Sequence, residues 1–135
     1  MKVYTSYYSA TDKLPAELKQ VGVSGWVPES FNGVRLKELA PKREWWMEWH
    51  SKFKDNINSK ESIEWYTVKY KETVLDVVDF NEIKGRLEQL GGDVVLLCFE
   101  RPGSFCHRHL IAKWLSENGL PCSEYDFSTK TEGNR

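Results

Sequence analysis

The sequence lacks several features that define large classes of proteins. Its 135 residues contain no apolar run near the roughly 18 residues of a membrane span, and no basic-then-apolar leader opens it. The net charge of −1 gives the whole molecule no bulk attraction for nucleic acid or for an anionic membrane. We therefore expect a cytoplasmic protein with no membrane partner, in which any polyanion meets a local basic patch.

Cysteines are few, and common catalytic signatures are missing. Cys98, Cys106 and Cys122 are an odd number in a chain without a leader, so we expect reduced thiols rather than a disulfide framework. There is no Gly-x-Ser-x-Gly elbow, no Gly-rich dinucleotide fingerprint and no phosphatase or P-loop spacing. These absences argue against a serine hydrolase and a dinucleotide enzyme, and no cofactor is predicted.

One stretch organises the chain. Residues 94–99 form a continuous apolar run, which is typical of a strand buried on both faces. Pro102-Gly103 breaks that strand, and Ser104 is the predicted N-cap of a helix whose apolar positions are Leu110, Ile111, Trp114 and Leu115. Ligands of open α/β folds bind outside the carboxyl ends of the strands. The sequence therefore predicts a site on the strand, loop and helix start at 98–109.

The remaining patterns predict a single α/β domain. Strands are expected at 2–8, 21–24, 34–39 and 120–127, and helices at 12–19, 42–50, 61–78 and 79–90, where Asp79 and Glu82 form a capping box. No internal repeat or linker divides the chain. We expect a compact three-layer, Rossmann-like domain with a mainly parallel sheet over 1–127, followed by a flexible tail over 128–135.

The predicted helix start concentrates groups that suit an anion. Cys106 in the first turn would have its thiol pKa lowered by the helix dipole, which favours a nucleophilic thiolate. Glu100, at the edge of the site, is the candidate general base. Backbone amides and a guanidinium together suit a phosphate, and the candidate anion-binding residues are Arg101, Ser104, His107, Arg108 and, after the first strand, Ser6. The alternative is a packed cysteine with capping side chains.

Aromatic residues form a second cluster. Three of the six tryptophans, Trp45, Trp46 and Trp49, fall within five residues beside Lys42 and Arg43. Indoles next to cations suit nucleobase stacking, and Trp45, Trp46 and Tyr8 are the candidate stacking residues. The alternative is that Trp45 and Trp49, which share a helical face, belong to the core.

A metal is a third interpretation. Its candidate ligands are Cys98, Cys106, His107, His109, Cys122 and His50. Paired Cys-x-x-Cys or His-x-x-His ligands are missing, and Cys98 is expected to alternate into a packed sheet. No metal ligand is therefore assigned.

Several blocks resemble the domain of unknown function 488 family, especially its short bacterial and phage members. They are residues 2–8, 39–42 with 47–49, 96–103 and 105–109, in the family's order. The resemblance implies a compact α/β domain with a Cys-His-Arg turn after a central strand, and no established activity. Longer members carry Gly-His-Ser and Asp-Val-Arg where this chain has Thr5-Ser6-Tyr7 and Gly22-Val23-Ser24, so only the triplet Cys106-His107-Arg108 carries over.

Together these observations predict an α/β protein that binds or acts on a nucleotide or nucleic acid. The alternatives are a non-catalytic accessory module and a metal-holding Cys/His domain. Whether the protein is an enzyme, which ligand it takes and its oligomeric state stay open at this stage.

Overall fold

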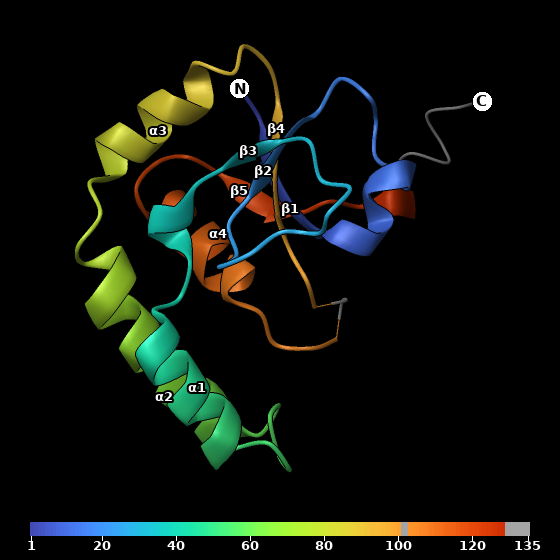
Figure 1. Ribbon diagram of the computed structural model, residues 1–135. Coiled ribbons are helices and arrows are strands. Elements are labelled where there is room, and N and C mark those ends of the chain that lie inside the picture. Colours follow the sequence, from blue (N-terminus) through green and yellow to red (C-terminus); the bar gives the residue numbers. More distant parts are fainter. Residues whose placement is uncertain (101–102, 129–135) are drawn as a thin grey trace.

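The computed structural model describes residues 1–100 and 103–128 (Figure 1). Arg101, Pro102 and residues 129–135, which include all but the first residue of the predicted tail, lie outside the described residues. The strands are β1 (Val3–Tyr7), β2 (Lys19–Gly22), β3 (Val34–Arg35), β4 (Val94–Cys98) and β5 (Cys122–Glu124). The helices are η1 (Tyr8–Lys13), η2 (Lys37–Leu39), α1 (Arg43–Lys52), α2 (Lys60–Tyr70), η3 (Lys71–Leu75), α3 (Phe80–Glu88) and α4 (His107–Glu117).

The five strands form one parallel sheet in the order β3-β2-β4-β1-β5. β4 lies at its centre, as its apolar run predicts, and all five of its residues are buried. Its register pairs Val94 with Val3 on one side and with Lys19 on the other. The carboxyl ends of β1, β2 and β4 therefore meet at one edge of the sheet, and the predicted parallel α/β architecture is confirmed.

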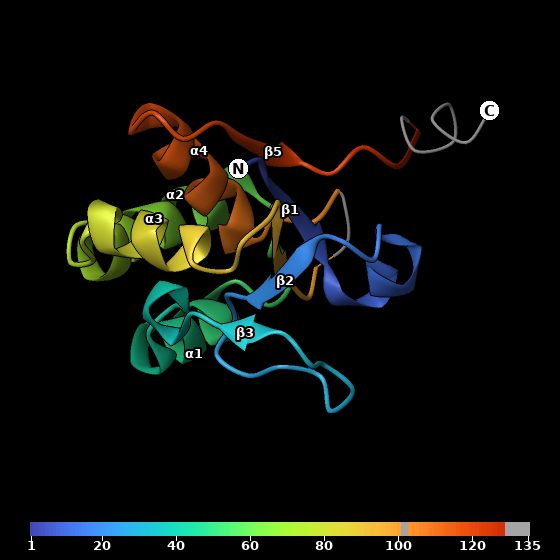
Figure 2. The ribbon, with the colours of Figure 1, turned by 90° about the horizontal axis from the view of Figure 1, so that it is seen from above.

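The α-helices cover one face of the sheet and η1 covers the other (Figure 2). The larger core lies beneath the α-helices and includes Leu96, Ile111 and Leu115, each of which is fully buried. The smaller core on the opposite face contains Tyr8, Leu14, Leu18, Val95 and Leu97. Alternate residues of β4 thus point into different cores, which gives the three layers of the domain.

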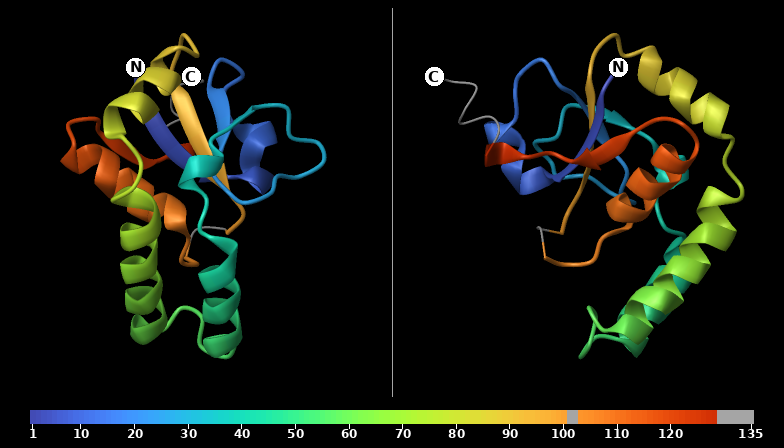
Figure 3. Two further views of the ribbon diagram at one scale, coloured as in Figure 1. Left: turned by 60° about the vertical axis from the view of Figure 1, so that its left-hand side comes forward. Right: turned by 180° about the vertical axis from the view of Figure 1, so that it is seen from behind.

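Helices α1 and α2 lie side by side and extend past the carboxyl ends of the strands (Figure 3). Trp45 and Trp49 are the buried face of α1, as their spacing predicts, and both pack edge-on against Tyr66 of α2. The side chain of Ser59 caps α2 by accepting from the Ser62 backbone N–H. This helix pair forms a wall beside the edge where the strands end.

Local structure differs from the sequence predictions in the first helix and the third strand, and it agrees with them at Asp79. The helix expected at 12–19 is wrong, because η1 occupies Tyr8–Lys13 and β2 already begins at Lys19. The third strand is only two residues long, and η2 follows it. The capping role of Asp79 is confirmed, since its carboxylate accepts from the N–H groups of Asn81 and Glu82 at 2.8 and 3.3 Å.

The predicted N-cap Ser104 is also wrong. The N-cap of α4 is Cys106, whose backbone is extended (φ −146°, ψ 146°), and the helix begins at His107. Gly103 takes a positive φ of 95°, and the Phe105 N–H donates to Asn58 Oδ1 at 3.0 Å, outside the helix. The chain is thereby held extended through Cys106, so α4 starts two residues later than a Ser104 cap requires.

Within residues 1–100 and 103–128, none of the helices has the length and apolar character that crossing a membrane requires.

Candidate functional site

A cavity of about 310 Å³ lies at the carboxyl edge of the sheet. Its walls come from the loop after β2, from α1 and α2, from the end of β4 and from the start of α4. Of the residues singled out from the sequence, Glu100, Cys106, His107 and Trp46 line it together with Cys98. The cavity therefore lies where the parallel topology predicts a ligand site.

Cys98 and Cys106 are joined by a disulfide bond at the floor of this cavity. The expectation that all three cysteines are reduced is wrong for this pair in this structure. Cys98 ends β4 and faces the α-helical core, and the extended backbone of Cys106 brings the second sulfur to the same point. Cys106 is therefore a nucleophile only after this bond is reduced.

His107 is held with a defined orientation. Its Nε2 lies 2.7 Å from the carbonyl oxygen of Val23, and its Nδ1 lies 3.7 Å from Cys106 Sγ. A carbonyl oxygen can only accept, so Nε2 donates and Nδ1 keeps its lone pair on the side of the sulfur. Burial lowers the pKa of His107 to about 4, and the charge of Arg108 acts in the same direction. The imidazole is neutral at pH 7.

Arg108 lies beneath the cavity and is fully buried. Its Nε and Nη2 donate to the two carboxylate oxygens of Glu124, each at 3.0 Å, in a bidentate pair. Its Nη1 donates to the Glu100 carbonyl at 2.5 Å and to Cys98 Sγ at 3.3 Å. Arg108 thus joins the end of β4 to β5, and these internal acceptors occupy its guanidinium.

Glu100 places a carboxyl group at the cavity wall. The residue is exposed as a whole, yet partial burial of its carboxyl raises the pKa of this group from its ordinary value, against the opposing effects of a backbone hydrogen bond and of nearby Arg108. A carboxyl whose pKa is raised holds its proton closer to neutral pH than an ordinary surface carboxyl does. Its place and its chemistry both suit proton transfer to a ligand in the cavity.

The aromatic candidates separate into two groups. Trp45 and Tyr8 are buried and do not line the cavity; Trp45 Nε1 donates to Thr73 Oγ1, and the Tyr8 hydroxyl lies 2.7 Å from Ser24 Oγ. Trp46 lines the cavity, is 36% exposed and stacks on His50.

Trp26 and Arg43 also line the cavity, and neither was assigned as a site residue from the sequence. Trp26, in the loop after β2, is 67% exposed and packs on Phe99 with ring centroids 4.3 Å apart. Arg43, the first residue of α1, is exposed, and none of the described residues forms an ion pair with it. The sequence signals that could have identified them were an indole in the loop after a predicted strand and a cation at the start of a predicted helix.

The remaining candidates lie apart. Ser6 is fully buried in β1 on the face of the smaller core, and its Oγ has no hydrogen-bond partner among the described residues. Ser104 is half-buried and does not line the cavity, and Arg101 lies outside the described residues. The structure therefore does not bring Ser6 or Ser104 to the cavity.

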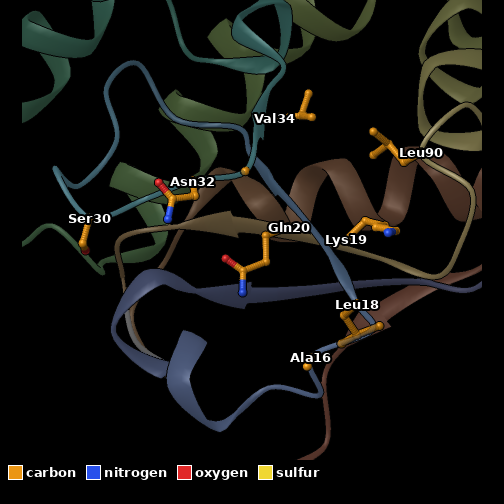
Figure 4. Close-up of a pocket in the computed structure, with 9 residues that line it drawn as sticks. Ala16, Leu18, Lys19, Gln20, Ser30, Asn32, Val34 and Leu90 are labelled. Carbon is orange, nitrogen blue, oxygen red and sulfur yellow. The ribbon is translucent and has the colours of Figure 1, made fainter.

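A second, larger hollow of about 500 Å³ lies near the opposite ends of β2 and β3 (Figure 4). Among the described residues that line it, Lys19 carries the charge, and the others are neutral: Ala16, Leu18, Gln20, Ser30, Asn32, Gly33, Val34 and Leu90. Its described lining residues include no acid, thiol or imidazole, so the smaller cavity is the better candidate for a reactive site.

Fold and site together define an α/β domain with a Cys-His-Arg turn after its central strand. The family model described as "Active DUF488-N3 subclade" matches residues 4–119. The chain therefore belongs to the DUF488 family, as the sequence blocks predict. No curated protein and no solved structure matches the chain.

Proposed function

We propose that the protein binds a nucleotide, or a nucleotide unit of a nucleic acid, in the cavity at the carboxyl edge of the sheet, and acts on the bound base. The observation that carries this proposal is that two exposed indoles, Trp26 and Trp46, line one 310 Å³ cavity with the carboxyl of Glu100. Stacking of a base on an aromatic side chain is worth about 1–3 kcal/mol and tolerates any base. A cavity of this size suits a small ligand.

The anion part of the proposal rests on Arg43. Arg108 was one of the expected anion-binding residues, but its guanidinium donates to Glu124, Glu100 and Cys98. Arg43 at the cavity wall is free of such partners among the described residues and presents a planar group that matches a phosphate. Arg101, one residue beyond Glu100, remains a proposed second cation.

The catalytic part rests on Glu100, as a proton donor or acceptor for the bound base. Cys106 remains the proposed nucleophile of the reduced, metal-free protein. The word "Active" in the description of the matched subclade supports turnover over a purely structural module. A binding module without turnover is the second candidate, because the indoles and Arg43 serve binding alone equally well.

Calorimetric titration tests the binding step with nucleoside monophosphates and short single-stranded DNA and RNA oligonucleotides. We expect Trp26→Ala and Trp46→Ala each to weaken binding about tenfold, and Arg43→Ala to weaken it and reduce its salt dependence. The controls are Met47→Ala and Lys42→Ala, exposed neighbours that do not line the cavity. Absence of binding to every probe, or equal effects in the controls, overturns the proposal.

Chromatography of the ligand after incubation tests turnover. A chemical change in the ligand that Glu100→Gln abolishes, while binding is retained, supports the enzyme. Binding without any change in the ligand favours the accessory module instead.

A further inference from the structure

Cys98, Cys106 and His107 bring three metal-ligating atoms together at the floor of the cavity. The two Sγ atoms and a ring nitrogen of His107 all lie within 4.8 Å of one another, and all three residues are buried. The 3.7 Å between Cys106 Sγ and His107 Nδ1 is close to the roughly 3.6 Å that a tetrahedral zinc ion sets between a sulfur and a nitrogen ligand. The donor set of two thiolates and an imidazole is one that zinc prefers.

The surroundings of these atoms match those of a metal site. Zinc-binding histidines usually donate their other ring N–H to a carbonyl or carboxylate, which fixes the tautomer. His107 does so through Nε2 to the Val23 carbonyl at 2.7 Å, leaving the lone pair of Nδ1 directed at the sulfur. Nη1 of Arg108 also donates to Cys98 Sγ at 3.3 Å, a hydrogen bond of the kind that orients metal ligands.

We infer that the reduced protein binds one zinc ion through Cys98 Sγ, Cys106 Sγ and His107 Nδ1, with a fourth coordination position open to the cavity. The open position follows from the lining of the cavity, which includes all three residues. Three protein ligands and an exchangeable fourth position are typical of catalytic rather than structural zinc. Cys106 then serves as a ligand and is no longer available as a nucleophile.

A thiol reductant supplies the electrons that convert the disulfide into the zinc-binding form. Two reductant thiols supply two electrons to the Cys98–Cys106 bond, giving one reductant disulfide and two protein thiols. Each protein thiol then loses its proton as its sulfur binds Zn²⁺, so two protons are released per ion bound. The oxidised chain lacks both thiolates and is the matched control for the reduced one.

Zinc content of the reduced and the oxidised protein tests the inference. After loading with a slight excess of Zn²⁺ and gel filtration, we expect about one zinc per reduced chain and none per oxidised chain. Cys98→Ser and Cys106→Ser should each weaken zinc binding more than about 100-fold, beyond what loss of an outer hydrogen bond costs. Cys122→Ser, which alters the free cysteine of β5, should retain the zinc.

A serine variant that fails to fold would give no information about zinc binding. Cobalt titration of the reduced wild-type chain tests the same site without a substitution. Co²⁺ bound by thiolates gives an intense sulfur-to-metal charge-transfer absorption, which saturates at one ion per chain if the inference is correct. No zinc uptake, no thiolate absorption, or loss of zinc in Cys122→Ser overturns it. The proposed function is tested separately, because Trp26→Ala should retain zinc while it weakens nucleotide binding.

Discussion

Two arginines near the cavity, Arg108 of α4 and Arg43 of α1, have opposite surroundings and opposite expected roles. On the interior side, Arg108 is fully buried and donates to Glu124, Glu100 and Cys98. On the cavity side, Arg43 and Trp26 are exposed and lack such an internal network among the described residues. A guanidinium held by several internal hydrogen bonds stabilises the fold, whereas one without such bonds can bind a ligand. Residue type alone does not distinguish the two.

The largest stability effect is expected for Arg108→Met. This substitution leaves the Glu124 carboxylate without its bidentate partner and frees the Glu100 carbonyl, and breaking such a buried pair costs about 3 kcal/mol. The free energy of unfolding from urea denaturation measures the loss. The control is Arg86→Met, which breaks the exposed pair with Glu38 and should cost under about 1 kcal/mol. If both variants lost the same free energy of unfolding, the buried Arg108 pair would stabilise the fold no more than the exposed Arg86 pair does.

Glu124→Gln should have a smaller effect. The amide keeps one acceptor for Arg108 or for the Thr5 hydroxyl but loses the charge, and the Glu124 side chain is already 30% exposed. We expect a loss of about 1.5 kcal/mol, at the low end for hydrogen bonds to charged groups. The same urea measurement checks it. A loss larger than that of Arg108→Met would mean that the carboxylate supports more than this one pair.

Trp26→Ala tests whether an exposed residue of the cavity serves binding rather than stability. Because the indole is 67% exposed, its removal should change the free energy of unfolding by less than about 0.5 kcal/mol. The same variant is expected to weaken nucleotide binding about tenfold. Large destabilisation with unchanged binding would place Trp26 among the structural residues and reverse the comparison.

The smallest effect is expected at Cys122, which is half-buried. Burial, followed by the nearby charge of Glu124, raises the pKa of Cys122 to about 12. At pH 8 roughly 1 in 10,000 of such thiols is ionised, so alkylation by iodoacetamide is very slow. In the folded, reduced protein Cys122→Ser should leave the number of rapidly labelled thiols unchanged, as mass spectrometry will show. A drop by one label would mean that this thiol is ionised far more readily.

The central elements of the fold could be predicted because their signals are local. The apolar run of β4, the spacing of Trp45 and Trp49 and the cap at Asp79 each depend on residues within one or two turns of chain. The start of α4 was missed because Cys106 is positioned by partners far along the chain, including the bond of Asn58 to Phe105. A good capping residue such as Ser104 carries no information about such a bond.

The site was only partly predictable for the same reason. The strand–loop–helix pattern brings Glu100, Cys106 and His107 near one another between β4 and α4, but Cys106 is the N-cap of α4 and not a residue of its first turn as predicted. The sequence does not reveal that Glu124, sixteen residues after Arg108, neutralises that guanidinium, because the pairing depends on β5 joining the sheet beside β1. It also does not show which exposed indole faces the cavity.

The sheet ends on both sides in very short strands, two residues in β3 and three in β5. A free strand edge is a template on which a second chain can add by backbone hydrogen bonds, and long flat edges promote amyloid-like aggregation. Here the outermost strands offer too few consecutive backbone groups for such growth. The chain thus keeps its long, apolar strand β4 at the centre, shielded by neighbours, and limits edge-to-edge polymerisation through its architecture alone.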